Sequence, residues 1–284
     1  MRTMTRRSMA TSQRQPKIEL PTRRSRLAES PVGIADVLTP VAVRVFSDCE
    51  MRWFYEHLLG VPDPPTASEA LERAIRAALL TNFRYKLESK QNLHIEGVVG
   101  LFRRAWEKQQ QAAVFSDEEH PLEMGATGEA LVRIYMKQAA PRIRPAAVEQ
   151  KTMRGVLASV RVQGEFDIRD EGGTIIAIRT AQHPPTRMDP MQRFELTTCR
   201  RLTYEASGKV RLDILITGND PHCVSQPWEV TEDDIRFNDT LYPLAQQAMR
   251  RGYYIPNRSS VHCSRHHCPH WRRCEDEFGG TVEP

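Results

Sequence analysis

Three closely spaced cysteines near the C-terminal end are the side chains of this sequence best suited to bind a metal. Cys263, Cys268 and Cys274 follow the spacing C-x4-C-x5-C in the segment VHCSRHHCPHWRRC. Thiolate ligands select zinc and iron–sulfur centres, and three thiols this close together suit such a centre better than three buried side chains. The spacing therefore predicts a metal or cluster site that still needs a fourth ligand.

Two kinds of fourth ligand are open. A distant cysteine, Cys49, lies in the phrase FSDCEMRWFYEHLLGVP. A histidine of the C-terminal segment would instead complete a Cys3His zinc site, and the candidates are His262, His266, His267 and His270. The other two cysteines, Cys199 and Cys223, stand alone and are interpreted as structural thiols, because free cysteine packs as a small hydrophobic side chain.

The overall composition excludes several classes of protein. The chain has 284 residues, of which 40% are hydrophobic and 27% are charged, enough for one large globular domain or two small ones. It has no apolar stretch near the roughly 20 residues that a membrane helix needs, and no apolar segment typical of a secretory signal at its N-terminus. The composition predicts a soluble, cytoplasmic protein that has no membrane partner.

The net charge of +4 is concentrated in one segment. Residues 1–30 carry eight Lys and Arg side chains against two Glu, so the rest of the chain is close to neutral. This segment is rich in Ser, Thr and Arg and poor in apolar residues, which predicts a disordered basic tail. A solvated tail, an arm that contacts phosphate backbone and an organelle transit peptide all remain open. Residues 31–284 are predicted to form a single domain.

The hydrophobic periodicity predicts the elements that position these residues. Helices come first, followed by a β-hairpin around the turn at residues 170–173 and then by helix, strand and helix, which is the order of a mixed α/β domain. The expected helices cover residues 34–59, 67–87, 95–110, 128–139, 191–206 and 239–251. The expected strands cover residues 156–166, 174–179, 210–217 and 228–231.

The phrase LTPVAVRVFSDCEMRWFYEHLLGVP at residues 38–62 resembles the opening helix of RecB-like nucleases of the PD-(D/E)XK superfamily. In the iron–sulfur branch, that helix carries a lone cysteine before an aromatic run, and the domain ends with three closely spaced cysteines. AddB-type helicase–nuclease subunits and CRISPR adaptation exonucleases belong to this branch. The resemblance implies a 4Fe-4S cluster, with zinc as the alternative, that closes the domain through Cys49, Cys263, Cys268 and Cys274.

The resemblance covers residues 38–275 approximately and implies a restriction-endonuclease-like core. Such a core has a mixed sheet flanked by helices, here with an N-terminal helical part and a C-terminal segment that ligates the cluster. The stretch VQGEFDIRDEGGTIIAIRTAQ at residues 162–182 resembles the hairpin that carries the active site. Family members use it to hold a divalent metal with carboxylates, beside a lysine that assists the attacking water.

This chain departs from the family pattern at most active-site positions. The pattern Gly-x-(Ile/Phe)-Asp ends on Asp167, but the following Asp/Glu-x-Lys reads Ala177-Ile178-Arg179. Alanine cannot bind a metal, and arginine is not equivalent to lysine because its planar guanidinium is effectively never deprotonated. The family histidine aligns with Arg76, and the family glutamine and tyrosine align with Glu195 and Cys199.

These departures predict a degenerate nuclease centre in which Asp167, Arg179 and Glu195 are vestigial and Asp167 caps the hairpin or pairs with Arg179. An active nuclease that uses Mg²⁺ or Mn²⁺ in a site rearranged around Asp167 and Glu195 is the first alternative. A scaffold protein whose metal site is purely structural is the second.

The expected function is DNA processing in a defence, recombination or repair complex. The chain would bind single-stranded DNA or duplex ends and work beside a partner subunit such as an active nuclease, a helicase or an integrase. Residues 240–274 hold several arginines and no Asp or Glu, and Tyr253, Tyr254 and Trp271 lie among the arginines, which favours a nucleic-acid surface; a solvated charged segment is the alternative. The candidate nucleic-acid-binding residues are Arg250, Arg251, Arg258, Arg265, Arg272 and Arg273.

Overall fold

The computed structural model describes residues 36–61, 64–265 and 268–282. The chain divides into two units, residues 1–31 and residues 32–284, and all the described residues belong to the second. The basic tail expected at residues 1–30 therefore lies outside the described residues.

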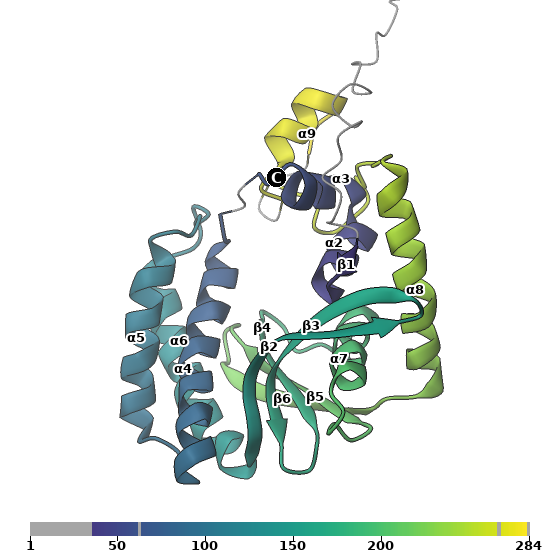
Figure 1. The fold of residues 1–284 in the computed structure, drawn as a ribbon. Helices are drawn as coiled ribbons and strands as arrows, with labels where there is room; N and C mark the ends of the chain where they lie inside the picture. The colour runs from purple at the N-terminus through teal and green to yellow at the C-terminus, as the bar shows by residue number, and fades with distance from the viewer. Residues whose placement is uncertain (1–35, 62–63, 266–267, 283–284) are drawn as a thin grey trace, which may run out of the picture. The chain divides into compact units, whose positions relative to one another are not determined.

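Within the described residues, six strands form one mixed sheet (Figure 1). The order is β1-β3-β4-β5-β6, and β2 pairs with β3 beside this path. The pairs β1–β3 and β4–β5 are parallel and the other pairs are antiparallel. The expected mixed α/β architecture is confirmed. The strands are β1 (Val37–Leu38), β2 (Pro145–Leu157), β3 (Val160–Asp170), β4 (Ile175–Ala181), β5 (Lys209–Ile216) and β6 (His222–Glu229).

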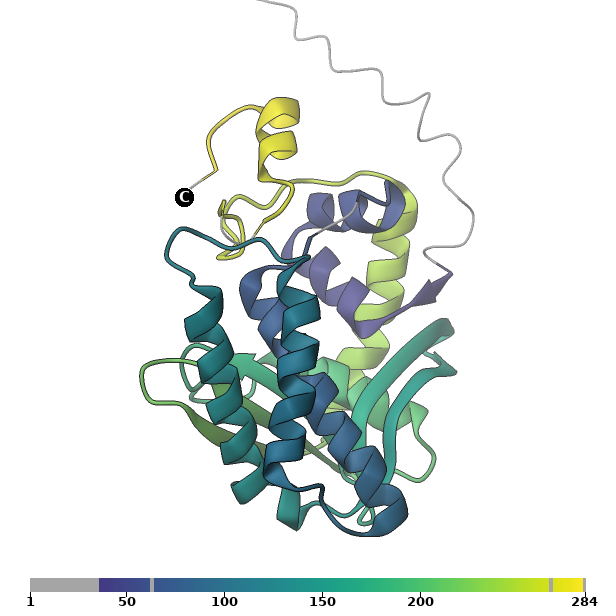
Figure 2. The ribbon, with the colours of Figure 1, turned by 90° about the vertical axis from the view of Figure 1, so that its left-hand side faces the viewer.

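Helices cover both faces of this sheet because the strand side chains alternate between two apolar cores. Ile176 and Ile178 of β4 pack in the core formed with α4 (Ala67–Ser89), α5 (Ile95–Gln110) and α6 (Pro121–Gln138). Ile175 and Ala177 face the opposite core, where α7 (Pro190–Leu202) packs. Figures 1 and 2 show the three-helix layer on one side of the sheet, and α7 and α8 (Glu232–Arg251) on the other.

The helices that border the sheet begin at defined caps. Thr66 and Glu69 form a reciprocal capping box at the start of α4, and Asp189 and Gln192 form another at the start of α7. Each box satisfies backbone N–H groups that the first turn of a helix leaves unpaired. The caps fix where α4 and α7 begin, and both helices contribute side chains to the candidate site.

The single helix expected over residues 34–59 is wrong. The segment instead forms β1, α2 (Pro40–Asp48), α3 (Glu50–Trp53) and the π-helix η1 (Phe54–Leu58). The Thr39 side chain accepts the N–H of Ala42 and starts α2, while the extended backbone of Cys49 (φ −153°, ψ 108°) separates α2 from α3. Apolar spacing continues across this break, which is why periodicity alone reads one helix.

The strand expected over residues 156–166 also crosses an unexpected turn. The chain reverses at Ala158 and Ser159, which have φ of 46° and 69°, and β2 then pairs with β3 as a long hairpin. Two-residue turns with positive φ normally contain Asn-Gly or Gly-Gly. Ala-Ser is not typical of such a turn, so the sequence does not predict it.

The remaining boundaries differ by less. The described helix α6 begins at Pro121 and α8 at Glu232, each earlier than expected, and α8 contains Pro243 within its length. The capping box of Thr231 and Asp234 starts α8 at an acidic first turn, which the apolar periodicity did not include in the expected helix. The strand β6 is longer than expected, and α9 (Trp271–Phe278) was not anticipated.

The C-terminal segment packs against the first helices. The hydroxyl of Tyr55 donates to Glu277 at 2.8 Å, and the Asn257 side-chain amide donates to the carbonyl of Asp48 at 2.8 Å. Trp53 and Phe54 are buried, and the Phe54 ring stacks on Tyr254 with centroids 5.0 Å apart. The aromatic run after Cys49 is thus core packing, and it joins segments more than 200 residues apart in sequence.

The β2–β3 turn yields a stability prediction. Replacing Ala158-Ser159 by Asn-Gly should raise the free energy of unfolding by about 1 kcal/mol, because Asn and Gly adopt positive φ at lower cost. Urea denaturation of the two proteins would measure the difference. Ser159→Val should shift it the other way, and a stabilising Ser159→Val would contradict the turn geometry.

Candidate functional site

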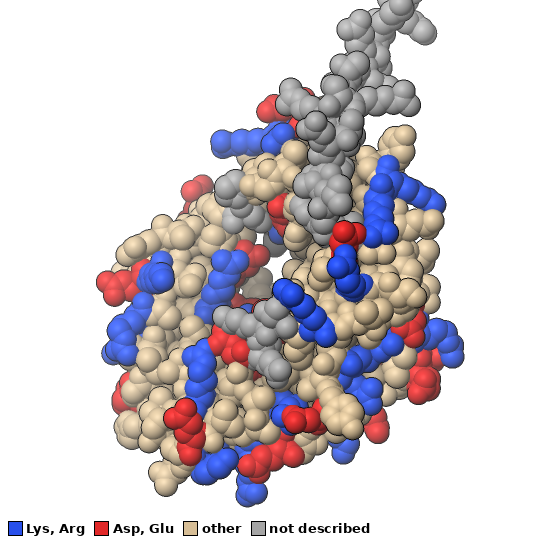
Figure 3. All heavy atoms as spheres, in the orientation of Figure 1, with Lys and Arg blue, Asp and Glu red and all other residues tan. Residues whose placement is uncertain are grey.

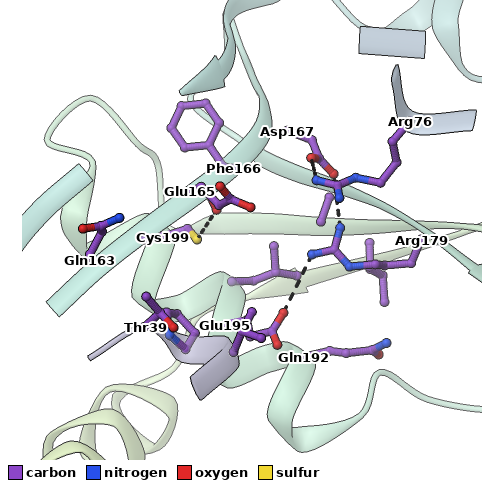
Figure 4. Close-up of a pocket in the computed structure, with 16 residues that line it drawn as sticks. Thr39, Arg76, Gln163, Glu165, Phe166, Asp167, Arg179, Gln192, Glu195 and Cys199 are labelled. Atoms are coloured by element: carbon purple, nitrogen blue, oxygen red, sulfur yellow. Dashed lines mark hydrogen bonds and ion pairs between the residues drawn. The ribbon is translucent and has the colours of Figure 1, made fainter. Parts of the chain in front are cut away.

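A cavity of about 290 Å³ opens between α2, α4, the strands β3 to β5, and α7. Its lining includes every position that the resemblance aligned with the nuclease active site (Figure 4): Arg76, Asp167, Ala177, Arg179, Glu195 and Cys199. The alignment of Arg76 with a site position, made from sequence, therefore agrees with the position of its side chain.

Asp167 lies where β3 and β4 separate. The two strands pair at Ile168 and Ile176, and beyond this point the Ile178 N–H donates to Asp167 Oδ2 at 2.8 Å. The carboxylate thus takes the place of a backbone carbonyl in the ladder. Asp167 is only 2% exposed, so its negative charge must be compensated inside the protein.

Two guanidinium groups supply that compensation. Arg76, from α4, donates to Asp167 Oδ1, and Arg179 Nη1, from β4, lies 3.3 Å from Asp167 Oδ2 (Figure 4). Both oxygens of the carboxylate therefore already accept hydrogen bonds from N–H donors. The expected pairing of Asp167 with Arg179 is present, and Arg76 makes a second pair.

Arg179 also reaches the other carboxylate of the cavity. Its Nη2 lies 3.8 Å from Glu195 Oε2, while Arg44 Nε donates to Glu195 Oε1 at 2.9 Å. Burial alone would lower the pKa of Arg179, but the nearby carboxylates of Asp167, Glu72 and Glu195 outweigh burial and raise it. Arg179 stays charged and holds together the two acidic residues that a rebuilt metal site would need.

Sequence reasoning missed Glu72 as a member of this network. Glu72 lies one turn before Arg76 on α4, and its Oε2 accepts from the backbone N–H and the hydroxyl of Thr180 at 2.8 and 3.1 Å. The i,i+4 spacing of Glu72 and Arg76 was a visible signal that both face the same way. Arg44 gave no signal, because only the tertiary structure brings α2 beside α7.

The donor set does not fit a divalent metal. Mg²⁺ requires oxygen ligands, yet Ala177 contributes a methyl group and both oxygens of Asp167 are hydrogen-bonded. Three arginines face three carboxylates, so the network itself carries no surplus negative charge, and the other carboxylate that lines the cavity, Glu165, is exposed and lies outside the network. The network consists of Arg44, Arg76, Arg179, Glu72, Asp167 and Glu195.

Cys199 has a structural environment, as its isolated position in the sequence suggested. Its thiol donates to the carbonyl of Glu165 at 3.0 Å, and burial raises the pKa of Cys199 to about 12. Burial likewise raises the pKa of Cys223 to about 12. Both thiols are therefore neutral at physiological pH, which is a poor state for a nucleophile or a ligand.

The four cysteines predicted as ligands line a second, smaller cavity of about 20 Å³. Cys49 comes from the break between α2 and α3, and the other three come from the C-terminal segment. All four are free thiols, so the donor set suits a soft metal or a cluster. Among the described residues, however, no three His, Cys, Asp or Glu side chains are arranged to hold a single metal ion.

The histidines offered as alternative ligands have other surroundings. His262 Nδ1 lies 3.1 Å from Asp48, and the buried His270 lies 3.9 Å from Glu56. His266 and His267 lie outside the described residues.

Only part of the predicted arginine surface is free to meet a nucleic acid. Arg258 and Arg265 donate to backbone carbonyls of the C-terminal segment, and Arg273 pairs with Glu277 at 3.0 Å. These three support local structure. Arg251 and Arg272 are exposed, as is Arg250, which pairs with Asp36 at 2.7 Å.

Comparison with known proteins shows the class. The family model of the PD-(D/E)XK nuclease superfamily matches residues 37–275, and the chain belongs to this superfamily. No curated protein matches it. A crystal structure from Eubacterium rectale, provisionally named an exonuclease, is 12% identical with a TM-score of 0.46, covering 86% of this chain and 85% of that one. The crystal structure of SSO0001 is 14% identical with a TM-score of 0.28, covering 69% and 83%.

None of the described helices combines the length and apolar character that crossing a membrane requires.

The ion pairs predict that removing the Asp167 carboxylate destabilises the protein. Asp167→Ala should lower the free energy of unfolding by about 3 kcal/mol, because it takes from Arg76 its carboxylate partner and removes one of the three carboxylates that surround Arg179. Urea denaturation with a chelator present would measure it. Glu165→Ala, at the exposed neighbouring position, should change stability by no more than about 0.5 kcal/mol. If the carboxylates instead formed a metal-binding cluster without its metal, removing one would relieve repulsion between them. A stabilising Asp167→Ala would therefore contradict the ion-pair network.

Proposed function

We propose that this chain is a DNA-binding member of the PD-(D/E)XK superfamily whose nuclease centre no longer hydrolyses DNA. It would support an active nuclease, helicase or integrase in a defence, recombination or repair complex. One observation carries the proposal: Arg179 lies between Asp167 and Glu195, at 3.3 and 3.8 Å, where a metal-dependent site would need its cation.

A guanidinium can replace the charge of a metal ion but not its chemistry. A divalent metal lowers the pKa of a bound water and supplies hydroxide for attack at phosphorus. Arginine has no site at which to bind and ionise water, and it does not act as a base because it stays protonated. In this proposal the cavity keeps the positions of the family site but lacks the group that generates the nucleophile.

DNA binding does not depend on that chemistry. Affinity for nucleic acid comes mainly from contacts with phosphates, which exposed arginines can make in the absence of any metal. Arg251 and Arg272 are exposed and remain candidates for such contacts. A pure scaffold would show no salt-dependent DNA binding.

The same proposal includes a 4Fe-4S cluster held by Cys49, Cys263, Cys268 and Cys274. Its support is that four thiols from the two ends of the described unit line one cavity. The ligands of a cluster attach to different irons, so they need not be arranged around one ion as the ligands of zinc are. The cluster would connect the start of α3 to the C-terminal segment.

The cytoplasmic location stays a prediction.

The first test of the proposal is a cleavage assay on end-labelled single- and double-stranded DNA with Mg²⁺ or Mn²⁺. The wild-type protein should not cleave, although it should bind DNA with an affinity that falls as salt rises. Cleavage by the wild-type protein that disappears in Asp167→Ala would show an active, rearranged centre and would contradict the proposal.

Restoring the family residues gives the converse test. The triple variant Arg76→His, Ala177→Glu, Arg179→Lys should acquire metal-dependent cleavage, because it removes both guanidiniums and adds a second carboxylate. The matched control carries Ala177→Gln instead, which keeps the shape but not the charge. Equal cleavage by the control would mean that the new activity does not come from this site.

Anaerobic purification tests the cluster. The protein should be brown and contain about four iron and four sulfide per chain. Cys49→Ser should lose the colour. Cys199→Ser, at a buried thiol outside the cysteine cavity, should keep it. Colourless protein with one zinc per chain would replace the cluster by a zinc site.

A further inference from the structure

A groove of about 420 Å³ separates the tip of the β2–β3 hairpin from the C-terminal half of α8. It lies apart from both the Asp167 cavity and the cysteine cavity, with which it shares no lining residue. Its polar side chains can all donate hydrogen bonds, and none is acidic. The lining residues are Ala158, Ser159, Val160, Pro243, Gln246, Gln247, Arg250 and Arg251.

The charge around this groove is positive. Arg250 and Arg161 share a single carboxylate, Asp36, at 2.7 and 3.6 Å, so one of the two positive charges is left over. Arg251 is exposed, and no carboxylate among the described residues lies within ion-pair distance of it. Figure 3 shows basic side chains over the hairpin and over the C-terminal half of α8.

We propose that this groove binds the phosphate backbone of a DNA strand that continues along β3 to the Asp167 cavity. The inference rests on the proposed function and adds the place where the strand is held. Every polar side chain that lines the groove can donate a hydrogen bond, which suits phosphate oxygens. The groove has no aromatic side chain for base stacking, so the binding is independent of sequence.

The strand β3 joins the two sites and sets their separation. Val160 lines the groove and Asp167 lines the cavity, so seven residues of one strand span the distance, about 23 Å at roughly 3.3 Å per residue. A DNA strand in a duplex advances about 3.4 Å per nucleotide. A strand held in the groove therefore places its backbone about seven nucleotides from the cavity.

Charge reversal at Arg251 tests the groove. Arg251→Glu should weaken binding of a labelled duplex longer than about 12 base pairs by roughly tenfold and reduce the slope of log K against log salt by about 1. Fluorescence anisotropy over a salt series measures both. The matched control is Arg236→Glu, on the first turns of the same helix, where the side chain is 74% exposed and pairs only with its neighbour Asp233. Gln247→Glu, exposed in the groove, should weaken binding without removing any arginine.

Each outcome decides a separate point. Equal losses in Arg251→Glu and Arg236→Glu would report only net charge and overturn the groove, while leaving DNA binding intact. Wild-type protein that does not bind DNA would overturn the proposed function as well. Unchanged DNA binding in Arg251→Glu, together with capture of polyglutamate by the wild-type protein alone, would assign the groove to an acidic protein and overturn the inference.

Discussion

The buried carboxylate of Asp167 is the constraint on which the rest of the site depends. It replaces a backbone acceptor for Ile178 where β3 and β4 part, so the sheet needs an oxygen there. A buried negative charge without a partner costs several kcal/mol, and Arg76 and Arg179 provide the partners. The compensation of this one charge therefore ties α4 and β4 to the point where the sheet opens.

The ion pairs also join the elements that border the Asp167 cavity. Glu72 and Arg76 attach α4 to β4 and β3, and Glu195 connects α7 to Arg179 and to Arg44 of α2. Because each of these ion pairs joins two different elements, the network forms only in the folded protein. It holds the charged side chains of the cavity in one arrangement.

Helix α2 links the two cavities of the structure. Its first residues, Pro40 and Val41, line the Asp167 cavity, and Cys49, directly after its end, lines the cysteine cavity. Hydrogen bonds from Asn257 and Ser260 to Asp48 fix that end of α2 against the C-terminal segment. Anything that orders the four cysteines therefore also fixes α2, and with it Arg44 beside Glu195.

The residue patterns were enough to predict the fold class, most of the helices that flank the sheet, and the aligned site positions that line the cavity. Gly164 to Asp167 and the Gly-Gly turn leave one register for the active-site hairpin, so Ala177 and Arg179 could be placed without coordinates. Periodicity could not find the break at Cys49, because apolar spacing continues through it, nor the Ala158-Ser159 turn, because its backbone conformation has no sequence signal. The partners of the charged side chains, in contrast, become visible only in the folded protein: Arg76 pairs with Asp167, Arg44 with Glu195, and Glu72 with Thr180. Ion pairs between distant segments depend on how helices pack across a sheet, and local residue types do not encode that packing.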